Sequence, residues 1–137
     1  MSEEIGSTLP PPLLFELGAH PTSDVAKAIL LLTSDADGAA RVAVLGSPEL
    51  SVRDASHIGL RLHSDSNACA NVKRCGQAAL WCVLDAAAYC IRGTIAKAPA
   101  KVADAELESF ELTITSVLRD FQSNAPMVSG PTYRRLS

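Results

Sequence analysis

The polar residues best placed to bind an anion lie in one stretch of the chain, from Arg61 to Asn71. Ser66 and Asn67 stand at the start of a predicted helix, where unpaired backbone N–H groups and the helix dipole favour a negative charge. Ordinary helix capping explains the same two residues without a ligand. Both interpretations stay open, because Asp65 beside them would repel a phosphate unless its carboxylate points away.

Further polar residues extend this candidate anion site. Arg61 and His63 share one face of a predicted strand, and a guanidinium pairs well with phosphate. Asn71, one turn into the helix, contacts either a ligand or the adjacent strand, and Arg92 on a later strand contacts either a ligand or an ion-pair partner at an interface. The candidate cofactor-binding residues are Arg61, His63, Ser64, Ser66, Asn67, Asn71 and Arg92.

Other kinds of catalytic or metal chemistry find no support in the sequence. His20 and His57 have no partners at the spacing of a catalytic triad, and neither a Walker loop nor a G-x-G-x-x-G loop occurs. The cysteines form no C-x-x-C pair and have no histidine at zinc-finger spacing. We therefore predict no metal site and no catalytic side chain. The thiols are expected to be reduced and mostly buried, with Cys75 the most open to oxidation; they are Cys69, Cys75, Cys82 and Cys90.

Composition indicates one compact domain spanning residues 1–137. The chain has 137 residues, 47% of them hydrophobic and 20% charged, with a net charge of -3. This balance excludes a disordered protein and argues against nucleic-acid binding, which normally shows a basic footprint. No apolar stretch reaches the roughly 20 residues that span a bilayer, and residues 1–8 lack the pattern of a signal peptide. We expect a cytoplasmic protein that binds no membrane, with residues 1–8 disordered.

Six segments are predicted to be strands, with one helix inserted between the third and the fourth. Asp37-Gly38 between two apolar runs predicts a hairpin whose central residues both have positive φ. The helix is predicted over Asn67–Cys75, with Ser66 as its N-cap and Gly76 just past its end. The predicted strands are Ala28–Thr33, Arg41–Leu45, His57–Ser64, Gln77–Leu84, Tyr89–Ala98 and Phe110–Arg119.

The remaining segments carry weaker signals. A short helix is predicted near Leu13–Leu17, a capped turn over Ser23–Lys27 and a loop over Glu49–Ala55. Asp104–Gln122 fits both a helical stripe and a strand, and its β-branched residues favour the strand, after a helical turn near residues 104–107. The tail beyond residue 122 is predicted to be irregular.

These elements predict a small antiparallel barrel. Three of the strands do not alternate: Ile29–Leu32, Val42–Leu45 and Ala78–Leu84 are apolar throughout. Continuous apolar strands are buried on both faces, and a barrel this small buries only one face by itself. We therefore predict a homodimer whose two copies cover each other's strand faces. The single Trp81, in one of these strands, is expected in the core rather than on a ligand.

Four segments, in this order and spacing, resemble a known family. They are Thr33–Gly38 (TSDADG), His63–Gly76 (HSDSNACANVKRCG), Tyr89–Thr94 (YCIRGT) and Phe110–Asp120 (FELTITSVLRD). Together they resemble the FMN-binding split barrels related to pyridoxamine 5'-phosphate oxidase, over roughly residues 9–133. The resemblance implies a mainly β, six-stranded antiparallel split β-barrel with a short inserted helix. It also implies a homodimer with FMN at the subunit interface and the flavin phosphate near the start of the helix.

The sequence also departs from that family. Relatives carry a basic residue at the position of Asn67 or Ala68 and an arginine and a lysine on the strand where this chain has Val42–Leu45. The substrate-binding tail of the true oxidases is not recognisable, so pyridoxamine-phosphate oxidation is not expected. The resemblance implies an FMN-dependent oxidoreductase of unknown substrate. The alternative is a dimeric binding protein of the same fold without enzymatic activity, which binds no cofactor, or binds haem or deazaflavin, with His63 as the residue to test.

Overall fold

One antiparallel sheet forms most of the molecule in the computed structural model, which describes residues 1–19, 25–99 and 106–134. The larger strands are β3 (Ile29–Ser34), β4 (Ala40–Leu45), β6 (His57–His63), β7 (Gln77–Leu84), β8 (Ala87–Lys97) and β9 (Leu107–Asp120). Shorter elements are β1 (Ser2–Gly6), α1 (Pro11–Gly18), β2 (Val25–Lys27), the 3-10 turn η1 (Ser47–Glu49), β5 (Leu50–Asp54), α2 (Asn67–Cys75) and β10 (Thr132–Arg134).

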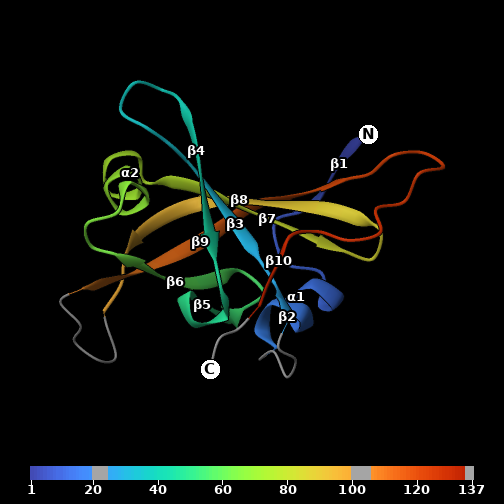
Figure 1. Cartoon of the computed structure of the whole chain (residues 1–137), viewed down its shortest axis with the longest axis horizontal. Helices are drawn as coiled ribbons and strands as arrows, with labels where there is room; N and C mark the ends of the chain where they lie inside the picture. Colours follow the sequence, from blue (N-terminus) through green and yellow to red (C-terminus); the bar gives the residue numbers. More distant parts are fainter. Residues whose placement is uncertain (20–24, 100–105, 135–137) are drawn as a thin grey trace.

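The strand order confirms the predicted mainly β, antiparallel class. The main sheet runs β4-β3-β7-β8-β9-β6-β5, with β1 also paired to β9, and its ladders are antiparallel. All six predicted strands are present, and α2 lies between the third and the fourth of them as expected. Figure 1 shows the sheet curling between α2 on one side and α1 on the other. No helix among the described residues is long and apolar enough to cross a membrane.

Several short strands of the structure were not predicted from the sequence. Residues 1–8 were expected to be disordered, yet β1 pairs with the end of β9 and the Met1 ammonium donates a hydrogen bond to Phe121 O at 2.6 Å. The side chains of β1 are all exposed, so no hydrophobic pattern could predict it. The predicted loop over residues 49–55 contains β5, which pairs with β6 through its backbone and has no fully buried side chain.

The predicted irregular tail and the predicted turn before β3 meet in a separate two-stranded sheet. Thr132–Arg134 pairs with Val25–Lys27, and the backbone of Pro131 accepts from Ala28 N at 2.9 Å. Val25–Lys27 is therefore a strand and not a capped helical turn, while Ser23 and Asp24 lie outside the described residues. The expected helical turn near residues 104–107 also falls mostly outside them, and Leu107 already belongs to β9.

Two central turn residues with positive φ occur in a different hairpin from the one predicted for Asp37-Gly38. In the β3–β4 turn only Gly38 has a positive φ, +88°, so the prediction of positive φ at both central residues is wrong. A turn with that property joins β7 to β8 instead, where Asp85 has φ 49° and Ala86 has φ 69°. The twist of the flanking strands favours this turn even though neither residue is glycine.

The core lies on the inner side of the curled sheet. A row of paired residues crosses four strands and is fully buried, at 0% exposure: Leu31, Leu80, Ile91 and Val117. Helix α1 adds Leu13 and α2 adds Val72 to the same cluster. Trp81, which was expected in this core, is not part of it, because it follows Leu80 on β7 and points to the outer side of the sheet.

Candidate functional site

Strand β6 leads to the candidate anion site and alternates as predicted. Ile58, Leu60 and Leu62 are buried in the core, at 4% exposure or less. Arg61 and His63 lie on the opposite, exposed face. The Arg61 guanidinium is held over η1, where its Nη2 donates to Pro48 O at 2.9 Å.

The start of α2 has the predicted capping geometry. Ser66 is the N-cap, and its Oγ accepts from Cys69 N at 3.1 Å and donates to His63 O at 2.7 Å. Gly76 ends the helix in the left-handed region, with φ 66°. The Ser66 hydroxyl is thus engaged within the chain, whereas Asn67, the first helical residue, is exposed.

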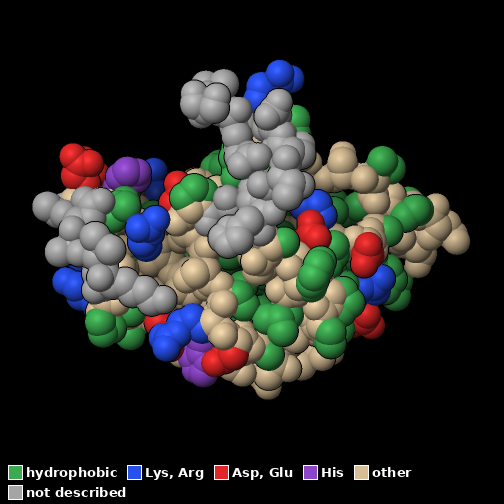
Figure 2. All heavy atoms as spheres, turned by 90° about the horizontal axis from the view of Figure 1, so that it is seen from below, with side chains coloured by type: hydrophobic (Ala, Val, Ile, Leu, Met, Phe, Trp, Pro, Cys, Tyr) green, Lys and Arg blue, Asp and Glu red, His purple; other side chains and the backbone are tan. Residues whose placement is uncertain are grey.

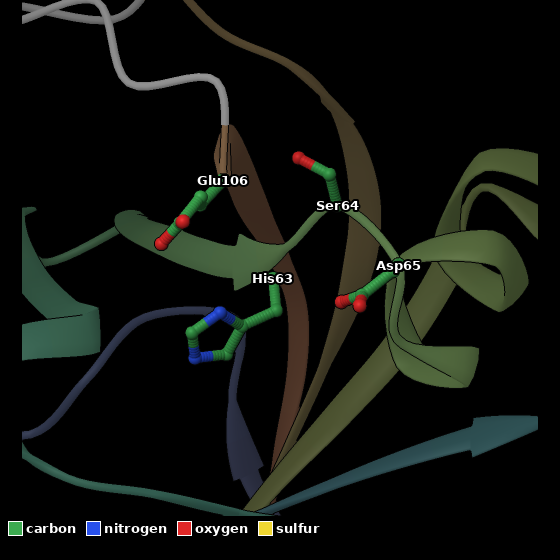
Figure 3. Close-up of a pocket in the computed structure, with 4 residues that line it drawn as sticks. All are labelled: His63, Ser64, Asp65 and Glu106. Atoms are coloured by element: carbon green, nitrogen blue, oxygen red, sulfur yellow. The ribbon is translucent and has the colours of Figure 1, made fainter.

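A pocket of about 440 Å³ lies next to this helix start, lined by His63, Ser64, Asp65 and Glu106. Figure 3 shows Glu106 and Asp65 on opposite sides of the end of β6, with the His63 imidazole below that end. Glu106 was not predicted, because only the pairing of β6 with β9 brings it here. In the described parts of the chain, no group of three or more His, Cys, Asp or Glu residues is arranged to hold a metal ion.

Asn71 is buried, at 3% exposure, and joins α2 to the β3–β4 hairpin. Its Nδ2 donates to Thr33 Oγ1 at 3.0 Å and to Asp35 Oδ1 at 2.8 Å, while its Oδ1 accepts from Arg74 Nη1 at 3.1 Å. Hydrogen bonds from Arg41 and then Asn71 lower the pKa of Asp35. These contacts show the structural role considered for Asn71, and they use both of its amide hydrogens.

A second network lies beneath α2, around the buried thiol of Cys69. This thiol donates to Glu108 Oε2 at 2.7 Å, and Lys73 Nζ approaches the same oxygen at 2.6 Å. Burial, followed by the hydrogen bond to Glu108, raises the pKa of Cys69 to about 11. Because the thiolate is the reactive form, this shift makes Cys69 less reactive at neutral pH than an ordinary thiol, despite its position in the first turn of a helix.

Arg92 lies far from Arg61 along the sheet. Its Nε donates to Ser116 Oγ at 3.0 Å, and Ser116 is its partner on β9, whereas the partner of Arg61 on β9 is Ser109. Seven residues of strand separate these two serines, which corresponds to roughly 23 Å. The predicted site residues therefore occupy three places: β6 and the start of α2, the internal network of Asn71, and the outer face of β8.

The outer face of the sheet divides into a polar and an apolar part. On β6 and β9 it carries polar residues such as Arg61 and Glu111. Across β4, β3, β7, β8 and β9 the register instead aligns Val44, Leu30, Trp81, Cys90 and Leu118 in one row. We call the apolar outer patch the set Leu30, Leu32, Val42, Val44, Ala79, Trp81, Cys90 and Leu118. Within it Val42 is 55% exposed and Val44 is 65% exposed.

FMN has an aromatic ring and a charged phosphate, which need different surroundings. The patch with Trp81 offers a flat apolar surface of the kind that binds an aromatic ring. Among the described residues, those that line the pocket beside the helix start include two carboxylates, Asp65 and Glu106, and no lysine or arginine. The described residues of the patch therefore suit the flavin ring, whereas those of the pocket offer a phosphate no Lys or Arg side chain.

Comparison with known proteins identifies the fold. No protein-family profile and no curated protein sequence matches the chain. A Lactobacillus delbrueckii structure, described as a pyridoxamine 5'-phosphate oxidase candidate, is 22% identical with a TM-score of 0.65, covering 84% of this chain and 98% of its own. An F420 reductase is 15% identical with a TM-score of 0.53, covering 66% of this chain and 88% of its own. The haem storage protein HutZ of Vibrio cholerae is 11% identical with a TM-score of 0.55, covering 67% and 84%.

The chain thus has the split β-barrel fold of these proteins, as the sequence resemblance implied. The neighbours are described as an oxidase candidate, an F420 reductase and a haem storage protein, so the same fold occurs with different ligands. Fold alone does not specify a function, and the side chains of this chain determine which ligand it binds.

Proposed function

We propose that this protein is a homodimeric flavoprotein that binds a flavin, FMN as the sequence resemblance implies, in a groove between two copies of the chain. The apolar outer patch is the observation that carries the proposal. A sheet face with half-exposed Leu30 and Trp81 and with exposed Val42 and Val44 is unusual for a monomer in water. Covering it with a second copy removes this apolar surface from water and leaves a crevice at its border.

The tail of the chain limits where the second copy can lie. Gly130 packs so closely on Val83 of β7 that a Cβ at this glycine would lie 2.7 Å from a Val83 methyl group. Val83 follows Ala79 and Trp81 on the same side of β7, so the tail already covers this end of the outer face. The patch between β4 and β8 is left for the partner. An isologous contact through a two-fold axis is the commonest arrangement for such a surface.

Within the proposed groove, the chain's own residues bind and orient the ring and exclude water. Trp81 supplies a stacking surface. Arg92 lies at the border of the patch, where it is the register partner of Ala79 on β7. A bound flavin supplies the redox chemistry, and the protein contributes position and electrostatics. We therefore propose an oxidoreductase in which no side chain acts as a general base, with its substrate unspecified.

The test combines the absorbance spectrum of the purified protein with its mass in solution. We expect two chains per particle and the visible absorbance of a flavin, or quenching of added flavin fluorescence. Val44→Glu should give single chains and abolish flavin binding, because it places a charge on the apolar outer patch. Val128→Glu is the matched control, since Val128 is 97% exposed and lies outside the patch. A single chain with no flavin affinity would refute the proposal.

A second candidate is a non-enzymatic binding protein of the same fold. Two observations favour it: the poor fit to phosphate described above, and the fold shared with a haem storage protein. If haem is the ligand, titration with haem should produce a Soret band that His63→Ala removes and His57→Ala retains, since His57 instead contacts Asp54 in a surface turn at 2.8 Å. Flavin binding without a haem spectrum would exclude this candidate.

A further inference from the structure

Arg92 is a charged residue in an otherwise uncharged part of the outer face. It is exposed on β8, between Ile91 and Gly93, which are buried on the other side of the strand. The register places Arg92 opposite Ala79 on β7 and Ser116 on β9. Its row and the neighbouring row with Trp81 contain no other charged side chain from β4 to β9. The two rows are Val42, Leu32, Ala79, Arg92 and Ser116, and Val44, Leu30, Trp81, Cys90 and Leu118.

The guanidinium of Arg92 is anchored but not neutralised. Its Nε donates to the hydroxyl of Ser116, which is 7% exposed, and this bond uses one of five N–H donors. The ion pairs between described residues do not include Arg92, although they include Lys27, Arg41, Arg53, Lys73, Lys97 and Arg119. On the face shown in Figure 2, Lys and Arg side chains likewise lie among Asp and Glu side chains and form no basic patch.

The proposed dimer gives this free charge a consequence. A second copy that covers the apolar outer patch also removes water from Arg92, and a guanidinium without water or a partner is unfavourable. Two acidic residues on the outer face of β9 already have cationic partners, Glu111 with Arg53 and Asp120 with the Met1 ammonium. A ligand in the groove that presents an acceptor to Arg92 would satisfy the guanidinium.

The strand geometry brings Arg92 within reach of a ring that stacks on Trp81. Side chains directly opposite on neighbouring strands have Cβ atoms about 5 Å apart, and diagonal neighbours are about 7–8 Å apart, which long side chains can bridge. Ala79 is directly opposite Arg92, and Trp81 is its diagonal neighbour. Ala79 has the smallest side chain of the patch, so it leaves room for a ring edge between Trp81 and Arg92.

We infer that Arg92 binds the carbonyl edge of the flavin ring and that the site therefore favours the reduced, anionic flavin over the oxidised one. The inference rests on the flavin binding proposed above and names the residue that sets its redox preference. Reduction takes up two electrons and one proton at N5 and, at mildly alkaline pH, leaves a negative charge at N1 beside the C2 carbonyl. A hydrogen bond from a guanidinium is stronger to this charged edge than to the neutral oxidised ring.

The experiment compares the affinities of the full chain for oxidised FMN and for FMN reduced with dithionite, without oxygen. The FMN phosphate is the same in both forms, so the ratio of the two affinities reports on the ring. Arg92→Gln should weaken binding of the reduced form by about tenfold more than binding of the oxidised form. The reduction potential of bound FMN then falls by about 30 mV for a two-electron couple. Arg53→Gln is the matched control, because Arg53 pairs with Glu111 from the edge strand β5, and it should leave the ratio unchanged.

Two further variants test the geometry. Arg92→Lys keeps the charge but loses the planar fork, so it should retain part of the preference for the reduced form. Ser116→Ala removes the anchor of Nε and should lower the affinity ratio by a smaller factor than Arg92→Gln. It also tests the inference if Arg92→Gln does not fold. An unchanged ratio in Ser116→Ala and in Arg92→Gln would refute the assignment of Arg92 to the ring.

Other outcomes separate this inference from its alternatives. An equal loss of affinity for both forms in Arg92→Gln would overturn it, because a contact with the phosphate produces that result. A weaker dimer of Arg92→Gln without flavin, measured by sedimentation equilibrium, would also overturn it, because Arg92 would then pair with the second copy. If the unmodified chain binds neither form, the proposed function fails and this inference fails with it. Binding of FMN with an unchanged ratio in Arg92→Gln refutes this inference alone.

Discussion

The carboxamide of Asn71 connects α2 with the β3–β4 hairpin through Thr33 and Asp35. Asn71→Ala would leave these buried or half-buried groups without their donor, and we expect the free energy of unfolding to fall by about 1–3 kcal/mol. The measurement is urea-induced unfolding followed by circular dichroism. Asn67→Ala, on the exposed start of the same helix, is the control and should change stability far less. Equal losses in the two variants would argue against this network.

Asp35 makes the fold sensitive to acid. Its pKa is lowered, mainly by the hydrogen bond from Arg41 and then by that from Asn71. A carboxyl group whose pKa is lower in the folded state stabilises the fold above its unfolded pKa of about 4, and this contribution is lost as the pH falls through the folded value. Asp35→Asn should therefore flatten the decline of the melting temperature below about pH 4. Glu4→Gln on the exposed β1 should leave the decline intact, and an unchanged profile in Asp35→Asn would contradict the prediction.

Among the elements, the turn between β7 and β8 contains a strained backbone conformation that a substitution can relieve. Ala86 has φ 69°, a conformation that favours glycine, and no Cβ is needed there because the residue is exposed. Ala86→Gly should raise the free energy of unfolding by about 1 kcal/mol, since the left-handed conformation costs an L-residue about that much. Thermal unfolding measures it. Ala36→Gly in the β3–β4 turn, where φ is not positive, is the matched control and should not stabilise; a destabilised Ala86→Gly would refute the argument.

The pairing of β8 with β9 depends on a glycine that lets the two strands approach closely. At the bulge where β8 meets β9, a Cβ on Gly93 would lie 2.3 Å from the backbone oxygen of Thr113. Only glycine allows the strands to come this near, and the bulge reverses which residues of β9 face outward. Ser116 and Leu118 are thereby brought to the outer face, in line with Arg92 and Cys90.

For the whole molecule, the proposed dimer predicts how two thiols react. Cys90 lies in the apolar outer patch, whereas Cys75 is exposed at the end of α2. If a second copy covers the patch, alkylation of Cys90 should slow as the protein concentration rises, while Cys75 reacts at a constant rate and serves as the internal control. Mass spectrometry of timed samples gives both rates. A Cys90 rate independent of concentration, down to the range where single chains are seen, would count against the interface.

Local pattern predicted much of the secondary structure. The six larger strands and α2 carry strong signals, because apolar runs between turn residues and a Ser–Gly pair around a short helix report short-range preferences. The alternation on β6 also placed Arg61 and His63 on one exposed face correctly. The strands β1, β2, β5 and β10 have few buried residues, so their existence depends on backbone pairing with neighbours and not on their own composition.

The sequence by itself determined the split-barrel class, the inserted helix with its Ser66 cap, and an excess of apolar strand surface that one small barrel cannot bury. Only the tertiary structure decided which groups meet. It drew Asn71 into an internal network, separated Arg92 from Arg61, turned Trp81 out of the core and brought Glu106 beside Asp65. The physical reason is that strand register and sheet curvature join residues distant in the chain, and no local preference encodes those pairings.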